Sequence, residues 1–368
     1  MSSAALLHAL QYAIGHRLTF AAFRRPGEAE VTLWAQQTPD LDRAESGLWW
    51  ELNDVFLLAP FRNGDHTPLV RSDVELTFGE SEPHWQRLLE CTGSTAQPRA
   101  TLRSATSRAT FEAAVEQARN ECATGEVEKI VLSRTMELPV GEADAPALFV
   151  EALHTRPDAF VALVMTPDHG LWLGATPERL ILAENDTVLV DAIAGTLPAA
   201  DAPTEVAGWG EKERHEQRVV AKSIAGTLID LGARHITIDG PDVIAAGPVA
   251  HLRTRIAANV EGRAMEELVC AVHPTPAVCG IPTDKARERI ATLEDRDREL
   301  YAGFWGPWSA DGRMELFVNI RCMRIHATSA ELHVGAGITA GSDPAAEWDE
   351  TEHKADSWRK LLLKDAVA

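Results

Sequence analysis

The feature that most limits the possible folds is a run of four short apolar segments with only tight turns between them. The segments cover residues 159–165, 170–176, 178–184 and 187–195, and the connections include the sequences TPDHG and END. Parallel strands need a crossover of about a dozen residues or more, whereas antiparallel neighbours can be joined by a few residues. The run therefore predicts consecutive strands of an antiparallel or mixed sheet.

Helical and extended patterns continue on both sides of this run. Residues 110–125 predict a helix, because Phe111 and Val115 share an apolar stripe and Gly125 is typical of a helix end. Residues 128–138 then alternate as a strand. The other expected elements are helices at residues 211–232, about 264–271 and 283–295, and strands at residues 299–309, 314–325 and 330–337.

The charge of the chain limits its ligands. The formal net charge of -20 opposes binding to nucleic acid or to an anionic membrane. No apolar run has the length of a membrane span, and the N-terminus lacks the basic start and cleavage site of a signal peptide, so we expect a cytoplasmic protein. The five cysteines include no CxxC pair, which argues against a disulfide framework or a structural zinc site. An anionic ligand needs local cations, helix N-termini or a metal ion.

Two pairs of glutamates have helical spacing. Glu347 and Glu350 follow Pro344, a residue suited to the first turn of a helix, and Glu213 and Glu216 have the same i, i+3 spacing. Four carboxylates brought together would repel one another unless a divalent cation neutralised them, and an all-oxygen ligand set suits Mg²⁺. The alternative is two unrelated solvated helix faces, since the chain has 55 acidic residues.

Three further residues are candidates for chemistry. Lys129 either lies at the exposed start of a strand or points into a cavity, where burial lowers the pKa of an amine and makes it a usable base. Glu178, at a strand junction, is either a general acid whose pKa is raised or a partner of Arg179. Arg321, within the expected strand 314–325, is either a surface charge or a bidentate partner for a carboxylate. A base and an acid on opposite sides of one site would suit addition and elimination.

Several longer motifs in a fixed order give a more specific signal. They are EKIVLSR, GATPERL, IAGT, EKERHEQRVV, HPTPAVCGIP, RELYAG, NIRC and GAGITAGSDPAAEWDET, followed by Lys354. From about Phe111 to Leu363 the chain resembles the chorismate-utilising enzymes, and most closely the isochorismate synthases. The resemblance implies a large mixed α/β fold of the α+β type, with two stacked, mainly antiparallel sheets flanked by helices. It also implies Mg²⁺ as the cofactor and chorismate as the substrate.

The resemblance also divides the chain. Residues 1–105 correspond to a family-variable N-terminal part of the fold, and residues 106–368 to the chorismate-binding catalytic region. The two parts are expected to form one continuous structural domain, and the first carries no catalytic pattern of its own. A monomer without a glutaminase subunit is expected.

Residue by residue, the resemblance assigns roles to the matching positions. Lys129 takes the position of the base that activates water, and Glu178 that of the general acid. Glu216 and Glu350 match the direct metal ligands. Glu213 and Glu347 match the acids that support them. The positions that line the site or hold the substrate carboxylates are Thr196, His251, Ala277, Tyr301, Arg321, Gly335 and Lys354.

The implied reaction is a reversible, Mg²⁺-dependent conversion of chorismate to isochorismate, in which water adds at C2 and the C4 hydroxyl leaves. The product would feed menaquinone or siderophore biosynthesis. Lys129 favours water over ammonia, the nucleophile that anthranilate synthases use with a glutaminase partner. Salicylate synthases keep this lysine and then eliminate pyruvate, but they tend to have a threonine near Ala277. A salicylate synthase and a non-catalytic chorismate-binding homologue stay as alternatives.

Overall fold

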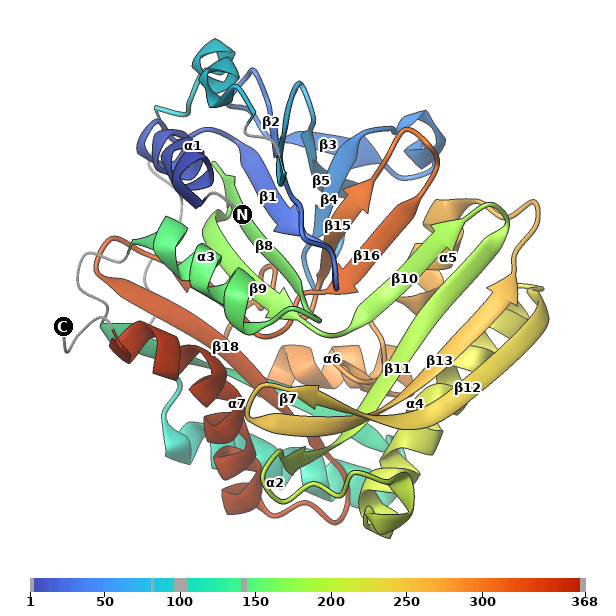
Figure 1. Ribbon diagram of the computed structural model, residues 1–368. Coiled ribbons are helices and arrows are strands. Elements are labelled where there is room, and N and C mark those ends of the chain that lie inside the picture. The colour runs from blue at the N-terminus through green and yellow to red at the C-terminus, as the bar shows by residue number, and fades with distance from the viewer. Residues whose placement is uncertain (1–2, 81–82, 96–104, 140–143, 365–368) are drawn as a thin grey trace.

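A computed structural model describes residues 3–80, 83–95, 105–139 and 144–364 of the chain (Figure 1). The α-helices in this part are α1 (Ser3–Gly15), α2 (Arg108–Thr124), α3 (Ala145–Thr155), α4 (Glu211–Asp230), α5 (Met265–Val272), α6 (Thr283–Leu293) and α7 (Pro344–Lys364). Three short 3₁₀ helices are η1 (Trp49–Glu51), η2 (Trp85–Glu90) and η3 (Val206–Gly208). The helices expected from the apolar patterns are all present, and α2 ends at Gly125, whose φ of 81° is left-handed.

The strands form two nine-stranded sheets. The first has the order β14 (Gly280–Ile281), β7 (Lys129–Pro139), β18 (Ser329–Ile338), β17 (Cys322–Ile325), β9 (Gly170–Thr176), β8 (Phe160–Thr166), β1 (Phe20–Arg24), β2 (Val31–Ala35) and β6 (Val74–Phe78). The second has the order β12 (Arg234–Ala246), β13 (Val249–Asn259), β11 (Thr187–Pro198), β10 (Arg179–Glu184), β16 (Met314–Val318), β15 (Phe304–Trp308), β4 (Val55–Ala59), β5 (His66–Arg71) and β3 (Asp42–Glu45). Strand β8 pairs antiparallel with β9, and β10 with β11, as the tight turns predict. The chain changes sheet between β9 and β10, however, so the run expected in one sheet is divided between the two sheets.

The two sheets pack face to face around a large apolar core. Phe160 of β8 stacks on Phe317 of β16 with ring centroids 4.1 Å apart, and Phe23 of β1 lies 5.3 Å from Phe56 of β4. A second core lies on the other face of the first sheet, under α1, α3 and α7. Each aromatic ring buried between the layers contributes about 1.5–3 kcal/mol. The expected architecture of two stacked antiparallel sheets flanked by helices is confirmed.

Two expected strands differ from the structure. Residues 314–325, expected as one strand, form β16 and β17, which belong to different sheets. The chain changes sheet next to Arg321, whose φ of 51° is incompatible with an extended strand, so Arg321 lies in a connection. Of residues 299–309, only Phe304–Trp308 is a strand, and Tyr301 therefore precedes it.

The hairpin β12–β13 is not among the elements expected from the sequence. Strand β12 leaves most of its side chains exposed or half-exposed, so no apolar alternation marks it. Strand β13 pairs with β11, and this register sets His251 opposite Thr196. His251 lies on β13, whose alternating burial is a signal that could have identified this strand.

Residues 1–105 contribute strands to both sheets. Strand β1 pairs with β8 in the first sheet, and β4 pairs with β15 in the second. The boundary expected near residue 105 adjoins residues 96–104, which lie outside the described residues. Among the residues that the structure describes, no helix is long and apolar enough to cross a membrane. All five cysteines are free thiols.

Candidate active site

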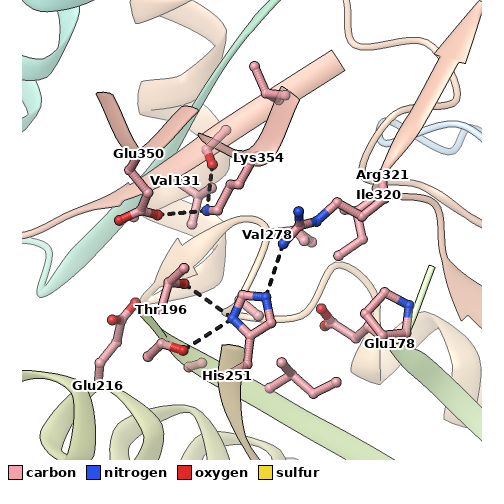
Figure 2. A pocket seen from close by; sticks show the side chains of 18 of the residues that line it. Val131, Glu178, Thr196, Glu216, His251, Val278, Ile320, Arg321, Glu350 and Lys354 are labelled. Atoms are coloured by element: carbon pink, nitrogen blue, oxygen red, sulfur yellow. Dashed lines mark hydrogen bonds and ion pairs between the residues drawn. The ribbon is translucent and has the colours of Figure 1, made fainter. Parts of the chain in front are cut away.

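A cavity of about 90 Å³ is lined by residues of both sheets and of α4 and α7 (Figure 2). Its lining includes each residue that the resemblance assigns to catalysis or substrate binding, namely Lys129, Glu178, Thr196, His251, Ala277, Tyr301, Arg321, Gly335 and Lys354. Glu216 and Glu350 also line it, and apolar side chains such as Val131 and Val278 complete the wall. Positions that are far apart in the sequence therefore meet in one cavity.

Lys129 begins β7 and is only 4% exposed. Its Nζ donates a hydrogen bond of 2.5 Å to Oε1 of Glu216 on α4. Gly337, on the neighbouring strand β18, leaves room for this pair. A Cβ at position 337 would lie 2.7 Å from Cε of Lys129 and 3.2 Å from the Glu216 oxygen. This close approach explains why position 337, the second glycine of the GAG sequence at residues 335–337, has no side chain.

Glu178 lies in the turn between β9 and β10 and is 2% exposed. Burial raises the pKa of its carboxyl to about 8, although the Oγ1 of Thr275 donates a 3.3 Å hydrogen bond that favours the charged form. The carboxyl therefore holds a proton at neutral pH, as a general acid must. In Figure 2, Glu178 lies on one side of the cavity and the carboxylates of Glu216 and Glu350 on the other.

The hydrogen bonds of His251 determine its tautomer. Nη2 of Arg321 lies 3.0 Å from Nε2 of His251, and a guanidinium can only donate, so Nε2 is the acceptor. The ring proton is therefore on Nδ1, which lies 3.1 Å from the carbonyl oxygen of Gly195 and 3.2 Å from Oγ1 of Thr196. Burial, together with the charges of Arg321 and Lys354, holds the pKa of His251 well below its usual value. The ring is neutral.

The contact with His251 orients Arg321 and leaves part of its guanidinium free. Nη1 of Arg321 is buried and has no hydrogen-bond partner in the described part of the chain. A buried guanidinium nitrogen without a partner is costly, and a ligand carboxylate would satisfy it. Burial lowers the pKa of Arg321 to about 10, so the side chain is still charged at neutral pH.

Lys354 and Tyr301 both lie next to Gly335. Nζ of Lys354 donates hydrogen bonds to Oε1 of Glu350 at 2.7 Å and to the carbonyl oxygen of Gly335 at 2.8 Å. A Cβ at position 335 would lie 2.8 Å from the hydroxyl of Tyr301. Burial raises the pKa of Tyr301 well above its usual value, so this hydroxyl remains a neutral donor. Gly335, the first glycine of the GAG sequence, thus makes space for a tyrosine.

The four acids of the two glutamate pairs divide into two groups. Glu216 and Glu350 line the cavity, whereas Glu213 and Glu347 are absent from its lining. Burial, followed by the charge of Glu350, raises the pKa of Glu347. Among the described residues, no three His, Cys, Asp or Glu side chains converge into a ready metal centre, so the four acids do not form one preformed cluster. Two carboxylates facing one cavity nevertheless fit Mg²⁺, which often binds one or two protein carboxylates and completes its shell with water and substrate oxygens.

His333 also lines the cavity, although the sequence patterns do not single it out. Its ring stacks with Trp172 at 4.9 Å and with Tyr301 at 5.5 Å. Burial lowers its pKa to about 4, and its Nε2 has no partner within the described residues. The period of two along residues 330–337 sets His333 on the same face as Gly335, a signal that could have identified it.

Comparison with known proteins relates this cavity to a family. The model of a family described as "Chorismate binding enzyme" matches residues 71–363. The chain belongs to the chorismate-binding enzymes. It is 34% identical over 253 residues to isochorismate synthase EntC of Escherichia coli strain K12, covering 66% of this chain and 64% of that protein. It is also 34% identical over 273 residues to isochorismate synthase DhbC of Bacillus subtilis strain 168, covering 70% of this chain and 68% of that protein.

The fold of this chorismate-binding enzyme extends the likeness to nearly the whole chain. The structure of MenF, the menaquinone-specific isochorismate synthase from Escherichia coli, matches with a TM-score of 0.79 at 23% identity, covering 98% of this chain and 91% of that one. The sequence match, by contrast, spans less than two thirds of the length of EntC, at 64%. All residues that line the cavity fall within the segment that matches the family. The family expected from the motifs is confirmed.

Proposed function

We propose that this chorismate-binding enzyme is an isochorismate synthase that reversibly adds water at C2 of chorismate and expels the C4 hydroxyl. One observation carries the proposal: Lys129 and Glu178 line the same cavity, and the buried carboxyl of Glu178 holds a proton at neutral pH. An amine that can accept a proton and an acid that can donate one are what hydroxyl exchange requires. The relatives named isochorismate synthases support the same reaction.

In the proposed reaction, Lys129 accepts a proton from water as the oxygen attacks C2, and Glu178 donates its proton to the departing C4 hydroxyl. One water enters and one leaves, so the composition of the ring compound is unchanged. In this structure Nζ of Lys129 donates a hydrogen bond to Oε1 of Glu216, so turnover requires that this contact gives way to one with water. Proton exchange with solvent then resets both groups.

We also propose that Glu216 and Glu350 are the direct ligands of Mg²⁺, with Glu213 and Glu347 in supporting positions. Bound there, the ion would orient the ring carboxylate of chorismate and offset its charge. The other carboxylate is held by Arg321 and Lys354, with Tyr301 as a neutral donor. Thr196, His251, Ala277 and Gly335 shape the walls of the site. These contacts supply the local cations that an anionic ligand needs in a chain of net charge -20.

The test is product analysis by liquid chromatography and mass spectrometry after incubation with chorismate, in Mg²⁺ or in EDTA. Isochorismate formed only with Mg²⁺ is the expected result. Salicylate with pyruvate would instead indicate a salicylate synthase, and Ala277 is the residue that argues against it. Unchanged chorismate under both conditions would indicate a non-catalytic homologue. A cytoplasmic location, a monomeric state and the absence of a glutaminase subunit stay predictions.

A further inference from the structure

A second cavity adjoins the catalytic one on the side of Arg321. It measures about 230 Å³ and shares Pro177 and Arg321 with the catalytic cavity. Its walls come from the end of α3, the connection after β9, the tip of the β12–β13 hairpin and α7. Alanine and glycine form much of this wall, so polar contacts to a ligand fall to a few side chains, chiefly Arg156 and Arg321.

The contacts of Arg156 hold its guanidinium in place, and none of them is an ion pair. Its Nη2 donates to the carbonyl oxygen of Ser357 at 2.6 Å, its Nη1 donates to Oγ1 of Thr155 at 3.2 Å, and the guanidinium lies 4.3 Å from the ring centroid of Trp358. All three partners are uncharged. Burial, followed by repulsion from Arg321, lowers the pKa of Arg156 to about 10. Both arginines are therefore charged at neutral pH, and they repel each other.

Two arginines near one cavity would normally share a carboxylate partner. Within the described residues, the hydrogen-bond partners of Arg156 and Arg321 are neutral groups, and Nη1 of Arg321 has none. The lining contains one acid, Asp158, which is solvent-exposed and forms no ion pair with either arginine among these residues. The cavity therefore has a positive excess in a chain whose net charge is -20. Glu151 and Glu350 partly offset the charges of Arg156 and Arg321 from nearby, but neither forms an ion pair with them among the described residues. Two arginines without an ion-pair partner at one cavity are a recognition element for an anion.

We propose that this cavity is an anion vestibule, through which an anionic ligand reaches the catalytic cavity by passing from Arg156 to Arg321. The identity of the ligand as a dicarboxylate rests on the proposed function, whereas the presence of an anion site does not. Because Arg321 lines both cavities, an anion held between the two arginines is already in contact with the group that would bind it during turnover. Arg156 itself does not line the catalytic cavity.

A third cavity, beside Lys129, is a less favourable route for an anion. It measures about 480 Å³, and its charged lining consists of Glu128 and Glu216 together with Lys129 and Lys212. Acids and lysines are equal in number there, and Lys129 is already paired with Glu216. A dianion would meet two carboxylates on this path, so electrostatics favour the route past Arg156.

Removing the charge of Arg156 should slow substrate capture without changing the rate of the chemical step. In Arg156→Gln we expect kcat/KM to fall about tenfold at low ionic strength, with kcat within about twofold of the wild type. The difference in kcat/KM between Arg156→Gln and the wild type should disappear near 1 M salt, because the Debye length shortens from about 30 Å at 0.01 M to about 3 Å at 1 M. Arg62→Gln is the matched control, since Arg62 is exposed and lines neither cavity.

Calorimetric titration with inorganic phosphate gives a readout that does not depend on turnover. The wild type, Arg156→Lys and Arg62→Gln should bind this small anion with similar affinity, and Arg156→Gln at least tenfold more weakly. If Arg156→Gln fails to fold, Arg156→Met removes the same charge while its unbranched stem can still cover Trp358.

The two proposals fail in different ways. If chorismate is not converted but phosphate binding depends on Arg156, the isochorismate synthase proposal fails and the vestibule stands. If chorismate is converted, and loss of the Arg156 charge changes neither phosphate affinity nor the salt dependence of kcat/KM, the vestibule is refuted.

Discussion

Replacing Gly337 by alanine tests whether the position of Lys129 sets the rate of turnover. The backbone at Gly337 does not have a left-handed φ, so alanine fits the local conformation of β18. The new Cβ, however, would lie 2.7 Å from Cε of Lys129 and 3.1 Å from its Nζ. Carbon atoms in contact are normally separated by about 3.5–4.0 Å, so the end of Lys129 must move by about 1 Å.

This displacement should cost far more in rate than in stability. Alanine in place of glycine at a compatible position stabilises a protein by about 0.4–1 kcal/mol, whereas inserting a methyl group into a packed site costs about 1–3 kcal/mol. The two effects partly cancel, because the group that must yield is the flexible end of a lysine. A misplacement of about 1 Å in a reacting group, by contrast, can lower the rate about 100-fold. We therefore expect kcat to fall about 100-fold with a shift of only a few degrees in Tm.

The assay is the initial rate of isochorismate formation at saturating chorismate, together with thermal unfolding followed by circular dichroism. Gly226→Ala is the control, since Gly226 lies in α4 and a Cβ there has no heavy atom within 4 Å. That variant should keep the wild-type kcat. A folded Gly337→Ala protein with the wild-type kcat would show that the observed position of Lys129 is not required for the chemistry, and would refute the reasoning.

The other predictions concern single groups of the site. Lys129→Ala should abolish turnover and also lower Tm, because it leaves the carboxylate of Glu216 without its ion-pair partner; an active, folded variant would contradict the role of Lys129 as the base. With the pKa of Glu178 near 8, kcat should fall about tenfold per pH unit above pH 8, and a flat profile there would exclude Glu178 as the acid. Because of the same raised pKa, the folded protein binds more protons than the unfolded chain between the ordinary glutamate pKa and about 8. The free energy of unfolding from urea titrations should therefore fall as pH rises through that window. Glu178→Gln should reduce this fall. Glu350→Ala should raise the Mg²⁺ concentration for half-maximal rate about tenfold or more, whereas Asp349→Ala, at an exposed neighbour, should not; equal metal dependence would rule out Glu350 as a ligand.

Some properties of the site can be inferred from local sequence. The tight turns between residues 159 and 195 predict antiparallel neighbours, which the structure has in the pairs β8–β9 and β10–β11, whereas the change of sheet between β9 and β10 is not predicted. The motifs around Lys129 and Glu178 identify both residues as site candidates, and both line the cavity. These inferences succeed because the length of a turn and the residues of a motif are properties of short, contiguous segments.

Tertiary structure decides which of these candidates meet. Spacing alone makes Glu213 and Glu216 equivalent, but only Glu216 lines the cavity, because packing of α4 against the sheet determines which side of the helix faces inward. Arg321 sits in a strand-like sequence, yet the chain changes sheet at this residue and its φ becomes positive. An apolar period of two or of 3.6 residues describes one strand or helix by itself. It carries no information on which other elements that strand or helix packs against.

The amino-acid sequence by itself determined the family, the antiparallel architecture and the identity of the acid and base candidates. Only the tertiary structure gave Lys129 its partner Glu216, fixed the tautomer of His251 and brought Arg156 close to Arg321. The physical reason is that these contacts join elements far apart in the chain, and their distances follow from sheet register and helix packing. Local sequence specifies neither of these directly.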